Sequence, residues 1–502
     1  MPERNYDVVI VGGGTAGCVL ASRLSENSSV SVLLIEAGAA TGPAEIQFPP
    51  AWPALLGGPA DWSFFTTPQS GLGGNPVFYP RGKVLGGSSA INAMAHIRGH
   101  RGDYESWRSA GADGWGYDDL LPFFKRSETA PAGDPRFRGT AGPMKVGTGQ
   151  VKHPVATAGL AAVAELGYPL TDDFNGENQE GGGWLEMNVF EGQRQTAFDG
   201  YLAGIERPNL TIVSEALVTS LTVTSGRCSG VTYLKNGKAT TVEAGEVALT
   251  AGAIASPQLL MLSGIGPAAE LEALGIKVLL DVPGVGKNLS DHPLAAVVYS
   301  PAPRLPDGVN NHADAVAMLR TNRDLTRPDV MALFLDIPFF PPTLQGPSTG
   351  FSIAFALLQP TSRGAVTLTS NDATAAPLID PALLQTKEDM DTMVAALEFS
   401  RQLGDTKAFV SLRNQEELPG VDVSSPAALR EYLQRDTGTY FHPVGTCRLG
   451  SDSEAVVDLT LKLNGLDGLR VADASVMPSV VSANTNATVL AIAERAAEWI
   501  GR

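Results

Sequence analysis

The chain of 502 residues is poor in cysteine and in basic side chains, and it has no long apolar run. Its three cysteines, Cys18, Cys228 and Cys447, are too few and too scattered for a disulfide framework or a zinc site, so a reducing compartment is the simplest fit. Lys and Arg number 36 against 53 Asp and Glu, and the net charge of −17 makes nucleic acid and anionic membrane surfaces poor partners. No run approaches the ~18 apolar residues that a transmembrane helix needs.

The sequence also leaves no room for a signal peptide, because a strand-like run begins at Tyr6. We therefore expect a cytoplasmic protein. Hydrophobic residues (43%) and charged residues (18%) stand in the proportions of an ordinary globular protein. A chain of this length exceeds a single hydrophobic core and predicts two or three domains.

The first forty residues predict a strand, a glycine turn, a helix and a second strand. Residues 6–11 and 30–35 are β-branched runs typical of buried parallel strands, and residues 18–26 have helical spacing. In the turn, Gly12 permits the tight bend, Gly14 lets the backbone approach a pyrophosphate, and Gly17 lets the helix pack closely. Glu36, which ends the second strand, can accept the ribose hydroxyls. The unit predicts dinucleotide binding, with a plain glycine turn of an unrelated α/β protein as the alternative.

The glycine motif alone does not separate FAD from NAD, although its place at the start of a long chain favours FAD. Elsewhere the pattern predicts loops, a group of short strands, a second domain on an antiparallel sheet and a final helix. The expected loops are residues 62–69 and 80–107. The expected strands are residues 210–213, 218–223, 230–234, 239–242 and 246–250, with an Asn236-Gly237 hairpin turn. The second domain is expected around residues 291–435, with an alternating run at residues 365–369, and the last helix at residues 486–500.

Further motifs carry a resemblance to a known family. They are residues 81–94 (RGKVLGGSSAINAM), 252–266 (GAIASPQLLMLSGIG), 284–292 (GVGKNLSDH), 441–446 (FHPVGT), 473–478 (DASVMP) and 483–486 (ANTN). Together with the N-terminal unit, and in the same order, they resemble the glucose-methanol-choline (GMC) family of FAD-dependent oxidoreductases. Within it the chain is similar to bacterial alcohol, aryl-alcohol and hydroxymethylfurfural oxidases and to choline dehydrogenase-like proteins.

The resemblance implies an α/β (α+β) fold with two domains. A discontinuous, Rossmann-like FAD-binding domain would take residues 1–155, 205–290 and 440–502. A substrate-binding domain, an antiparallel sheet backed by helices, would take residues 156–204 and 291–439.

The resemblance also places the FAD. The implied contacts are Gly12, Gly14, Thr15, Ala16 and Gly17 at the pyrophosphate, Glu36 and Ala37 at the adenosine ribose, Val218, Ala251 and Gly252 along the adenosine, Trp62, Val84, Gly87, Ser88, Asn92, Ala93, Met94, Ala95 and Phe441 around the flavin and phosphates, and Asp473, Ala474, Asn484 and Thr485 at the ribityl chain and the last helix. Residues 484–486 are also of the types that favour a plain helix cap. Some relatives attach FAD covalently through a histidine, and Ile91 stands at that position here, so we expect noncovalent FAD.

Oxidation of an alcohol needs a base for the hydroxyl proton and an acceptor for the hydride, which flavin N5 provides. Most of the six histidines (His96, His100, His153, His292, His312 and His442) are expected to be structural or exposed. His442 is the exception, because its segment matches the catalytic segment of the family. The resemblance gives it Asn486 as a partner that hydrogen-bonds the substrate oxygen, and we interpret His292 as structural. No metal site is expected.

The substrate is expected to be a small alcohol, oxidised to an aldehyde, with O₂ or another acceptor reoxidising the flavin. Residues 332–342, Phe351, Trp52, Trp62 and Trp107 would favour an apolar or aromatic primary alcohol if they line the pocket, and they are otherwise core. No acidic cage for a quaternary ammonium group is evident. Two alternatives stay open: a non-redox lyase resembling hydroxynitrile lyases, and a flavoprotein that acts on an unusual donor. The sequence does not predict the oligomeric state.

Overall fold

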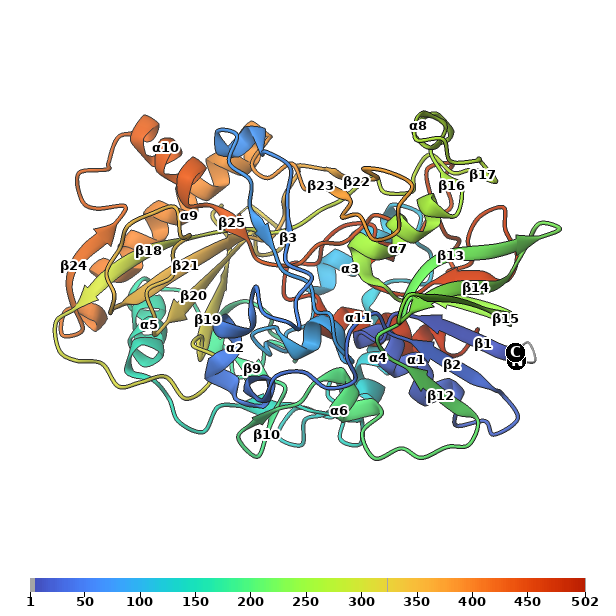
Figure 1. The fold of residues 1–502 in the computed structure, drawn as a ribbon. Helices are drawn as coiled ribbons and strands as arrows, with labels where there is room; N and C mark the ends of the chain where they lie inside the picture. The colour runs from blue at the N-terminus through green and yellow to red at the C-terminus, as the bar shows by residue number, and fades with distance from the viewer. Residues whose placement is uncertain (1–4, 323, 502) are drawn as a thin grey trace.

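The computed structural model describes residues 5–322 and 324–501, which form two seven-stranded sheets (Figure 1). The first sheet has the order β12 (Leu210–Val213), β2 (Val32–Ile35), β1 (Asn5–Val11), β15 (Lys238–Leu249), β14 (Arg227–Lys235) and β13 (Leu217–Thr224), with β26 (Leu469–Val471) beside β15. Strands β12, β2, β1 and β26 run parallel to their neighbours in it. Val8, Val9 and Ile10 are fully buried, which explains the unbroken apolar run of β1.

Strand β15 joins two strands that the sequence predicted separately, over residues 239–242 and 246–250. It pairs antiparallel with β14 in its first half and parallel with β1 from Glu243 onward, so the chain changes partner without a break. The predicted hairpin turn is confirmed, because Asn236 and Gly237 both have positive φ, at 51° and 73°.

Three helices pack together beside this sheet: α1 (Thr15–Leu24), α4 (Tyr117–Ser127) and α11 (Asn486–Ala496). The fully buried Glu494 of α11 holds them together, since it accepts hydrogen bonds from Arg23 of α1 and pairs with Arg126 of α4 at 3.0 Å. Helix α11 begins where the sequence predicted and ends earlier, at Ala496.

The second sheet lies at the left of Figure 1. Its order is β24 (Arg413–Leu418), β18 (Pro293–Pro301), β21 (Phe351–Leu357), β20 (Val330–Leu335), β19 (Ala315–Leu319) and β8 (Gly181–Trp184), with β25 (Gly438–Thr439) beside β18. All its pairs are antiparallel. Helices α5 (Pro154–Glu165), α9 (Lys387–Asp405) and α10 (Pro426–Asp436) pack against one face. An antiparallel sheet backed by helices is thus confirmed.

Side chains of the second sheet alternate between two cores. Phe334 and Phe351 point toward the helices, whereas Leu333, Leu335 and Ala354 point toward the opposite face. Phe351, a candidate for the pocket wall, is therefore core: its ring stacks between Tyr299 and Phe409, with centroids 5.3 and 5.5 Å away. The alternation of side chains along a strand explains why only part of residues 332–342 reaches the first sheet's side.

Residues 80–107, expected as a loop, include the start of a helix. Helix α3 (Arg101–Ser109) begins after His100, whose Nδ1 accepts a hydrogen bond from Gly102 N at 3.1 Å and so caps it. Residues 62–69 contain β3 (Phe64–Phe65), which pairs with β4 (Phe78–Tyr79). Trp107, another pocket candidate, is 1% exposed and packs on Tyr104 in the core.

Shorter elements complete the fold. The helices are α2 (Trp52–Leu55), α6 (Ala197–Tyr201), α7 (Gly252–Leu262) and α8 (Ala268–Ala273), and the strands are β5 (Glu128–Thr129), β6 (Met144–Lys145), β7 (Gly147–Thr148), β9 (Glu186–Met187), β10 (Val189–Phe190), β11 (Gln193–Arg194), β16 (Ile265–Gly266), β17 (Leu280–Asp281), β22 (Ala365–Thr367) and β23 (Leu378–Asp380). In the described residues no helix combines the length and the apolarity that crossing a membrane requires. The domain boundaries given above stay a prediction.

Candidate active site

A cavity of about 780 Å³ is lined by residues of both sheets. On the side of the first sheet it meets the glycine turn, Glu36 and the starts of α1, α7 and α11. On the side of the second sheet its lining residues include Leu294, Leu333, Leu335 and Ala354. We call these two parts the cofactor end and the substrate end.

The glycine turn at the cofactor end is shaped for close backbone approach. Gly12 has φ 102°, and a Cβ there would lie 2.7 Å from Thr250 O. A Cβ on Gly17 would lie 1.9 Å from Gly12 O, so Gly17 serves the packing of α1 rather than the cavity wall. Gly14 faces the cavity with only Gly87 near it, and in the described part of the chain no side chain caps α1. The free N–H groups and positive dipole end of α1 therefore suit a pyrophosphate.

Glu36 presents a fixed carboxylate to the same end of the cavity. Its Oε2 accepts a hydrogen bond from Gly13 N and its Oε1 accepts one from Gly38 N, both at 2.7 Å. Burial raises the pKa of Glu36, while these two bonds and the nearby Lys83 oppose the rise. The remaining lone pairs of the carboxylate can accept ribose hydroxyls.

All but two of the residues predicted to contact FAD line the cavity. Gly17 is one exception, for the reason given above. Val84 is the other: its side chain is 2% exposed and packs among Ile46, Leu55 and Ile91. Trp62, another of the predicted contacts, lies on the wall and has Lys83 Nζ 4.4 Å from its ring centroid. A dinucleotide such as FAD fits this donor set.

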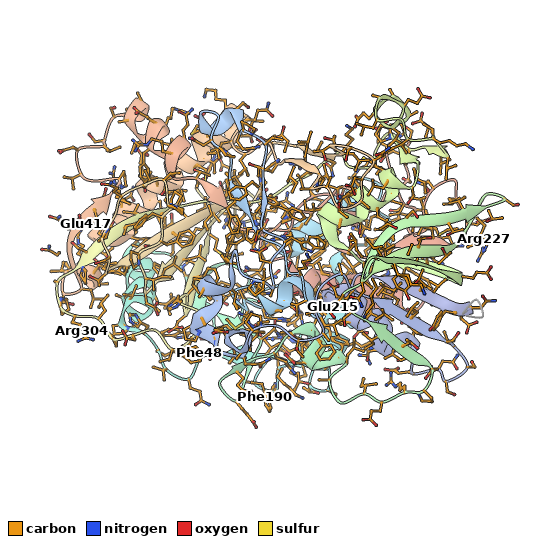
Figure 2. The ribbon with its side chains drawn as sticks, in the orientation of Figure 1. Phe48, Phe190, Glu215, Arg227, Arg304 and Glu417 are labelled. Carbon is orange, nitrogen blue, oxygen red and sulfur yellow. The ribbon has the colours of Figure 1, made fainter. Side chains whose placement is uncertain are left out.

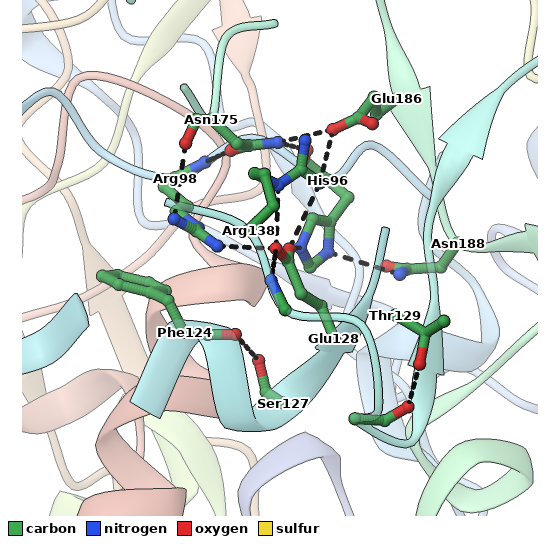
Figure 3. A network of polar contacts seen from close by, with 12 residues as sticks. His96, Arg98, Phe124, Ser127, Glu128, Thr129, Arg138, Asn175, Glu186 and Asn188 are labelled. Atoms are coloured by element: carbon green, nitrogen blue, oxygen red, sulfur yellow. Dashed lines mark hydrogen bonds and ion pairs between the residues drawn. The ribbon is translucent and has the colours of Figure 1, made fainter. Parts of the chain in front are cut away.

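Figure 3 shows a buried ion network that includes His96. His96 directly follows residues 92–95, which form one wall of the cofactor end. At the centre of the network the fully buried Glu128 pairs with Arg98 at 2.7 Å, Arg138 at 2.8 Å and His96 at 3.1 Å. Burial alone would raise the pKa of Glu128, but Arg98, His96 and Arg138 outweigh it and hold that pKa well below its ordinary range. His96 directly follows the wall segment, and Nδ1 of its ring lies 3.3 Å from Nδ2 of Asn188, whose backbone N–H donates to Met94 O. The network therefore fixes the end of the segment.

His442 is, of the described histidines, the one that lines the cavity. Its Nδ1 lies 3.0 Å from Nδ1 of His292, and Nε2 of His292 lies 3.2 Å from Leu358 O. The carbonyl can only accept, so Nε2 of His292 carries the hydrogen and its Nδ1 accepts from Nδ1–H of His442. Nε2 of His442 therefore carries no hydrogen and can act as an acceptor. Burial lowers the pKa of His292 to about 3, which keeps this ring neutral.

Asp291 fixes the backbone on both sides of this pair. Its Oδ1 accepts hydrogen bonds from His292 N and His442 N, each at 2.8 Å, and its Oδ2 accepts from the hydroxyls of Tyr79 and Thr439. The Asp-His pair of residues 291–292 is therefore structural, as interpreted from the sequence, and it also sets which nitrogen of His442 is basic.

The amide beside His442 belongs to Asn484 and not to Asn486. Nδ2 of Asn484 lies 3.2 Å from Nε2 of His442 and 3.4 Å from the Tyr440 hydroxyl, and its Oδ1 is buried without a protein partner. Asn486, the predicted partner, starts α11 and accepts a hydrogen bond from Thr15 Oγ1 at 2.9 Å. Asn486 lines the cavity, but this bond turns its side chain toward α1. The pairing of His442 with Asn486 is thus corrected to a pairing with Asn484.

The glycine turn, which suits a pyrophosphate, and a histidine that can accept a proton open into one cavity, and this combination fits a dinucleotide-dependent oxidoreductase. Comparison with known proteins gives the family: the chain belongs to the GMC oxidoreductases, whose N-terminal model matches residues 6–294 and whose C-terminal model matches residues 360–493. FAD is accordingly the cofactor, and the chain is an FAD-dependent oxidoreductase that acts on the CH–OH group of its donors.

Three similar proteins span almost the whole chain. Human mitochondrial choline dehydrogenase is 37% identical over 99% of this chain and 89% of its own length. Alcohol dehydrogenase [acceptor] from Pseudomonas putida is 37% identical over 99% of this chain and 96% of its own. The crystal structure of pyridoxine 4-oxidase from Mesorbium loti has a TM-score of 0.96 and 37% identity, with 99% of each chain covered.

We expect the FAD to be released intact by acid. Ile91, at the position where some relatives attach the cofactor, is an alkyl side chain on the cavity wall and cannot form a covalent bond to the flavin. Precipitation of the holoenzyme with trichloroacetic acid should leave the yellow colour in the supernatant. Colour that stays in the washed pellet would show a covalent bond and contradict the prediction.

Proposed function

We propose that this enzyme oxidises a primary alcohol with an aromatic or otherwise apolar substituent to the aldehyde, and that O₂ or another acceptor then reoxidises the cofactor. The observation that carries the proposal is the composition of the substrate end, where His442 and Asn484 face an apolar wall. Leu185, Leu294, Leu333 and Leu335 contribute to this wall. Trp52, Phe339 and Tyr440 add aromatic surface.

The distribution of carboxylates along the cavity wall favours an uncharged alcohol as the donor. Among the described residues that line the cavity, only Glu36 and Asp473 carry a carboxylate, and both belong to the cofactor end. Asp473 is occupied by hydrogen bonds from Gly252 N at 2.8 Å and Ser256 Oγ at 2.6 Å. A quaternary ammonium group would lose its hydration without gaining a counter-charge, and only cation–π contacts with the aromatic side chains of the wall would offset that loss. An aromatic ring loses little.

The mechanism follows from the two side chains at the boundary of the two ends. In the structure Nδ2–H of Asn484 donates to Nε2 of His442, and a bound alcohol would replace this bond. The substrate hydroxyl then donates to Nε2 of His442, which takes the proton, while Nδ2–H of Asn484 donates to the oxygen as negative charge develops on it. These two bonds fix the oxygen and so orient its carbon. Bound FAD supplies the hydride acceptor. Nδ1–H of His442 continues to donate to Nδ1 of His292, and this hydrogen bond holds the charged His442 ring in place.

The names of the relatives, which include an alcohol dehydrogenase, a choline dehydrogenase and a pyridoxine 4-oxidase, support an alcohol as donor. The two alternatives from the sequence, a non-redox lyase and a flavoprotein with an unusual donor, would use the same fold. They differ from the proposal in one observable, because only an alcohol oxidoreductase bleaches its flavin with an alcohol.

The test is anaerobic mixing of the yellow holoenzyme with benzylic, furanic, aliphatic, sugar and amino alcohols, choline among them. We expect benzylic or furanic alcohols to bleach the flavin absorbance fastest. Admission of air then separates an oxidase, which recovers its colour and forms peroxide, from a dehydrogenase, which does not. Faster bleaching by choline or a sugar would contradict the substrate class, and no bleaching by any alcohol would favour the two alternatives.

A further inference from the structure

Residues 48–56 form a short segment over the substrate end of the cavity, which we call the cap. It consists of a 3₁₀ turn (Pro49–Ala51) and helix α2, and it contains Trp52 and Leu56, which line the cavity. Phe48, at its start, is 62% exposed and lies at the surface (Figure 2). The cap is therefore one layer thick, with solvent on one side and the substrate end on the other.

Few bonds hold the cap to the second sheet. Apart from turns with its immediate neighbours, the described residues give it two hydrogen bonds. Trp52 Nε1 donates to Asn311 O at 2.9 Å, and Nε2 of His312 lies 2.9 Å from Pro50 O. The two bonds thus join the cap to Asn311 and His312, two successive residues that precede β19. The same Asn311 donates from Nδ2 to Ala93 O, at 2.6 Å, on the cofactor end.

The His312 ring has an acceptor on each side. Its Nδ1 lies 2.6 Å from Oδ1 of Asp336, which follows β20, and its Nε2 faces the Pro50 carbonyl. A carboxylate and a carbonyl can only accept, so both bonds form together only when the ring carries two hydrogens and a positive charge. In the neutral ring the shorter bond to Asp336 keeps the one hydrogen, and the lone pair of Nε2 then faces the lone pairs of Pro50 O.

We propose that doubly protonated His312 latches the cap over the substrate end, and that loss of one proton releases the cap and weakens the binding of bulky alcohols. His312 is thus a positioning residue that acts through Trp52. The inference rests on the proposed function for its effect on alcohols, but the latch itself is a property of the fold.

The charges around the ring set the direction of the pH effect. Asp336 faces Nδ1, and Asp314, two residues along the chain, adds a second negative charge, while residues 48–56 contain no charged side chain. Burial lowers the pKa of His312, but Asp336, the Pro50 carbonyl and Asp314 outweigh it, so the pKa is raised above its ordinary value of 6.5. The latch is closed below that raised pKa and opens as the pH increases through it.

The first test follows the cap itself in the holoenzyme, without any substrate. We expect hydrogen exchange measured by mass spectrometry, corrected for intrinsic rates, to show protection of the peptide spanning residues 48–56 at about pH 5.5 and loss of that protection above the titration of His312. His312→Gln, which has nearly the volume of histidine but no positive charge, should lack protection at every pH. Protection that is independent of pH in the wild type would overturn the latch.

The second test measures the affinity for a bulky aryl alcohol from anaerobic flavin reduction. For the wild type we expect Kd to rise several-fold with pH, with the limiting reduction rate unaffected by the latch, and for His312→Gln a high Kd throughout. Asp336→Asn, which keeps the shape and removes the charge, should move the transition to lower pH by about one unit or more. A wild-type pH dependence of Kd in both variants would overturn the proposal.

His153→Gln is the matched control. His153 is a buried histidine whose ring has one donor and one acceptor as neighbours: Nδ1 accepts from Val155 N, and Nε2 donates to Pro306 O at 3.0 Å. It needs no charge, so its replacement should leave the pH dependence of the cap unchanged. If no alcohol reduces the flavin and the cap still responds to pH, the proposed function fails and the latch stands. If an alcohol reduces the flavin but the cap does not respond to pH, the proposed function stands and the latch fails.

Discussion

Replacement of His442 by alanine is expected to lower the rate at which an alcohol reduces the flavin by about 10²–10⁴-fold, the range for loss of a positioned base. Of the described histidines, His442 alone lines the cavity, and its Nε2 carries no hydrogen because the ring hydrogen is on Nδ1 and is held by His292. The cofactor should stay bound, since the phosphate-binding turn and Glu36 are untouched. Anaerobic stopped-flow absorbance gives the rate, and the ratio of flavin to protein gives the occupancy.

Added imidazole provides the control for this variant. The alanine leaves a space of the shape of the lost ring, so imidazole should restore part of the rate in His442→Ala and leave the wild type unchanged. Near-normal reduction in the variant without imidazole would remove His442 from the mechanism. Loss of the flavin would instead assign it to cofactor binding.

The pKa of His442 predicts the pH range in which activity falls in acid. Burial, with His292 and Arg81 nearby, lowers the pKa of His442 well below its ordinary value of 6.5. The proton-accepting form of a base with a lowered pKa persists to lower pH. We therefore expect the acid limb of kcat/KM for a small alcohol, which does not fill the space under the cap, to lie below pH 6.5.

The dinucleotide-binding turn could be predicted from the sequence because its physical requirements are mostly local. A tight bend at Gly12, a helix that begins after Gly14 and an acid that ends the next strand are set by residues close together in the chain, whereas the contact of Gly12 with Thr250 joins residues 238 positions apart. The antiparallel sheet of the second domain was also predicted, from the family resemblance and from an alternating run at residues 365–369. That run contains β22, which pairs with β23 outside the seven-stranded sheet. Phe351 was a doubtful pocket residue because residue type alone does not show which face of a strand points to the cavity.

The rest of the site depends on contacts between distant residues. The bond that orients His442 joins it to a residue 150 positions away, and the bond between the cap and His312 spans 262 positions. Residues 484 and 486 are both asparagines of a helix cap, and spacing does not show which one turns inward. The Thr15 hydroxyl donates a hydrogen bond to Oδ1 of Asn486 and holds that side chain toward α1, so it is Asn484 that faces His442.

Asn484→Ala is expected to lower kcat/KM by about 10²–10³-fold, the usual cost of removing one hydrogen-bond donor to an oxygen that gains charge in the transition state. Nδ2 of Asn484 lies 3.2 Å from Nε2 of His442, so both can contact the same substrate oxygen. Steady-state kinetics with the best alcohol of the panel gives the ratio. Asn484→Asp separates donation from shape, because a carboxylate of the same size cannot donate and repels the developing charge.

Asn486→Ala is the matched comparison, two residues further along the same turn. It removes the hydrogen bond from Thr15 Oγ1, so we expect a loss of stability of about 1 kcal/mol and kcat/KM within a few-fold of the wild type. Thermal unfolding of the holoenzyme and the same kinetics measure the two effects. If Asn486→Ala costs as much activity as His442→Ala and Asn484→Ala costs little, the family resemblance located the partner correctly and the assignment returns to Asn486. If both substitutions are nearly neutral, neither amide contacts the oxygen and His442 acts without a second hydrogen-bonding group.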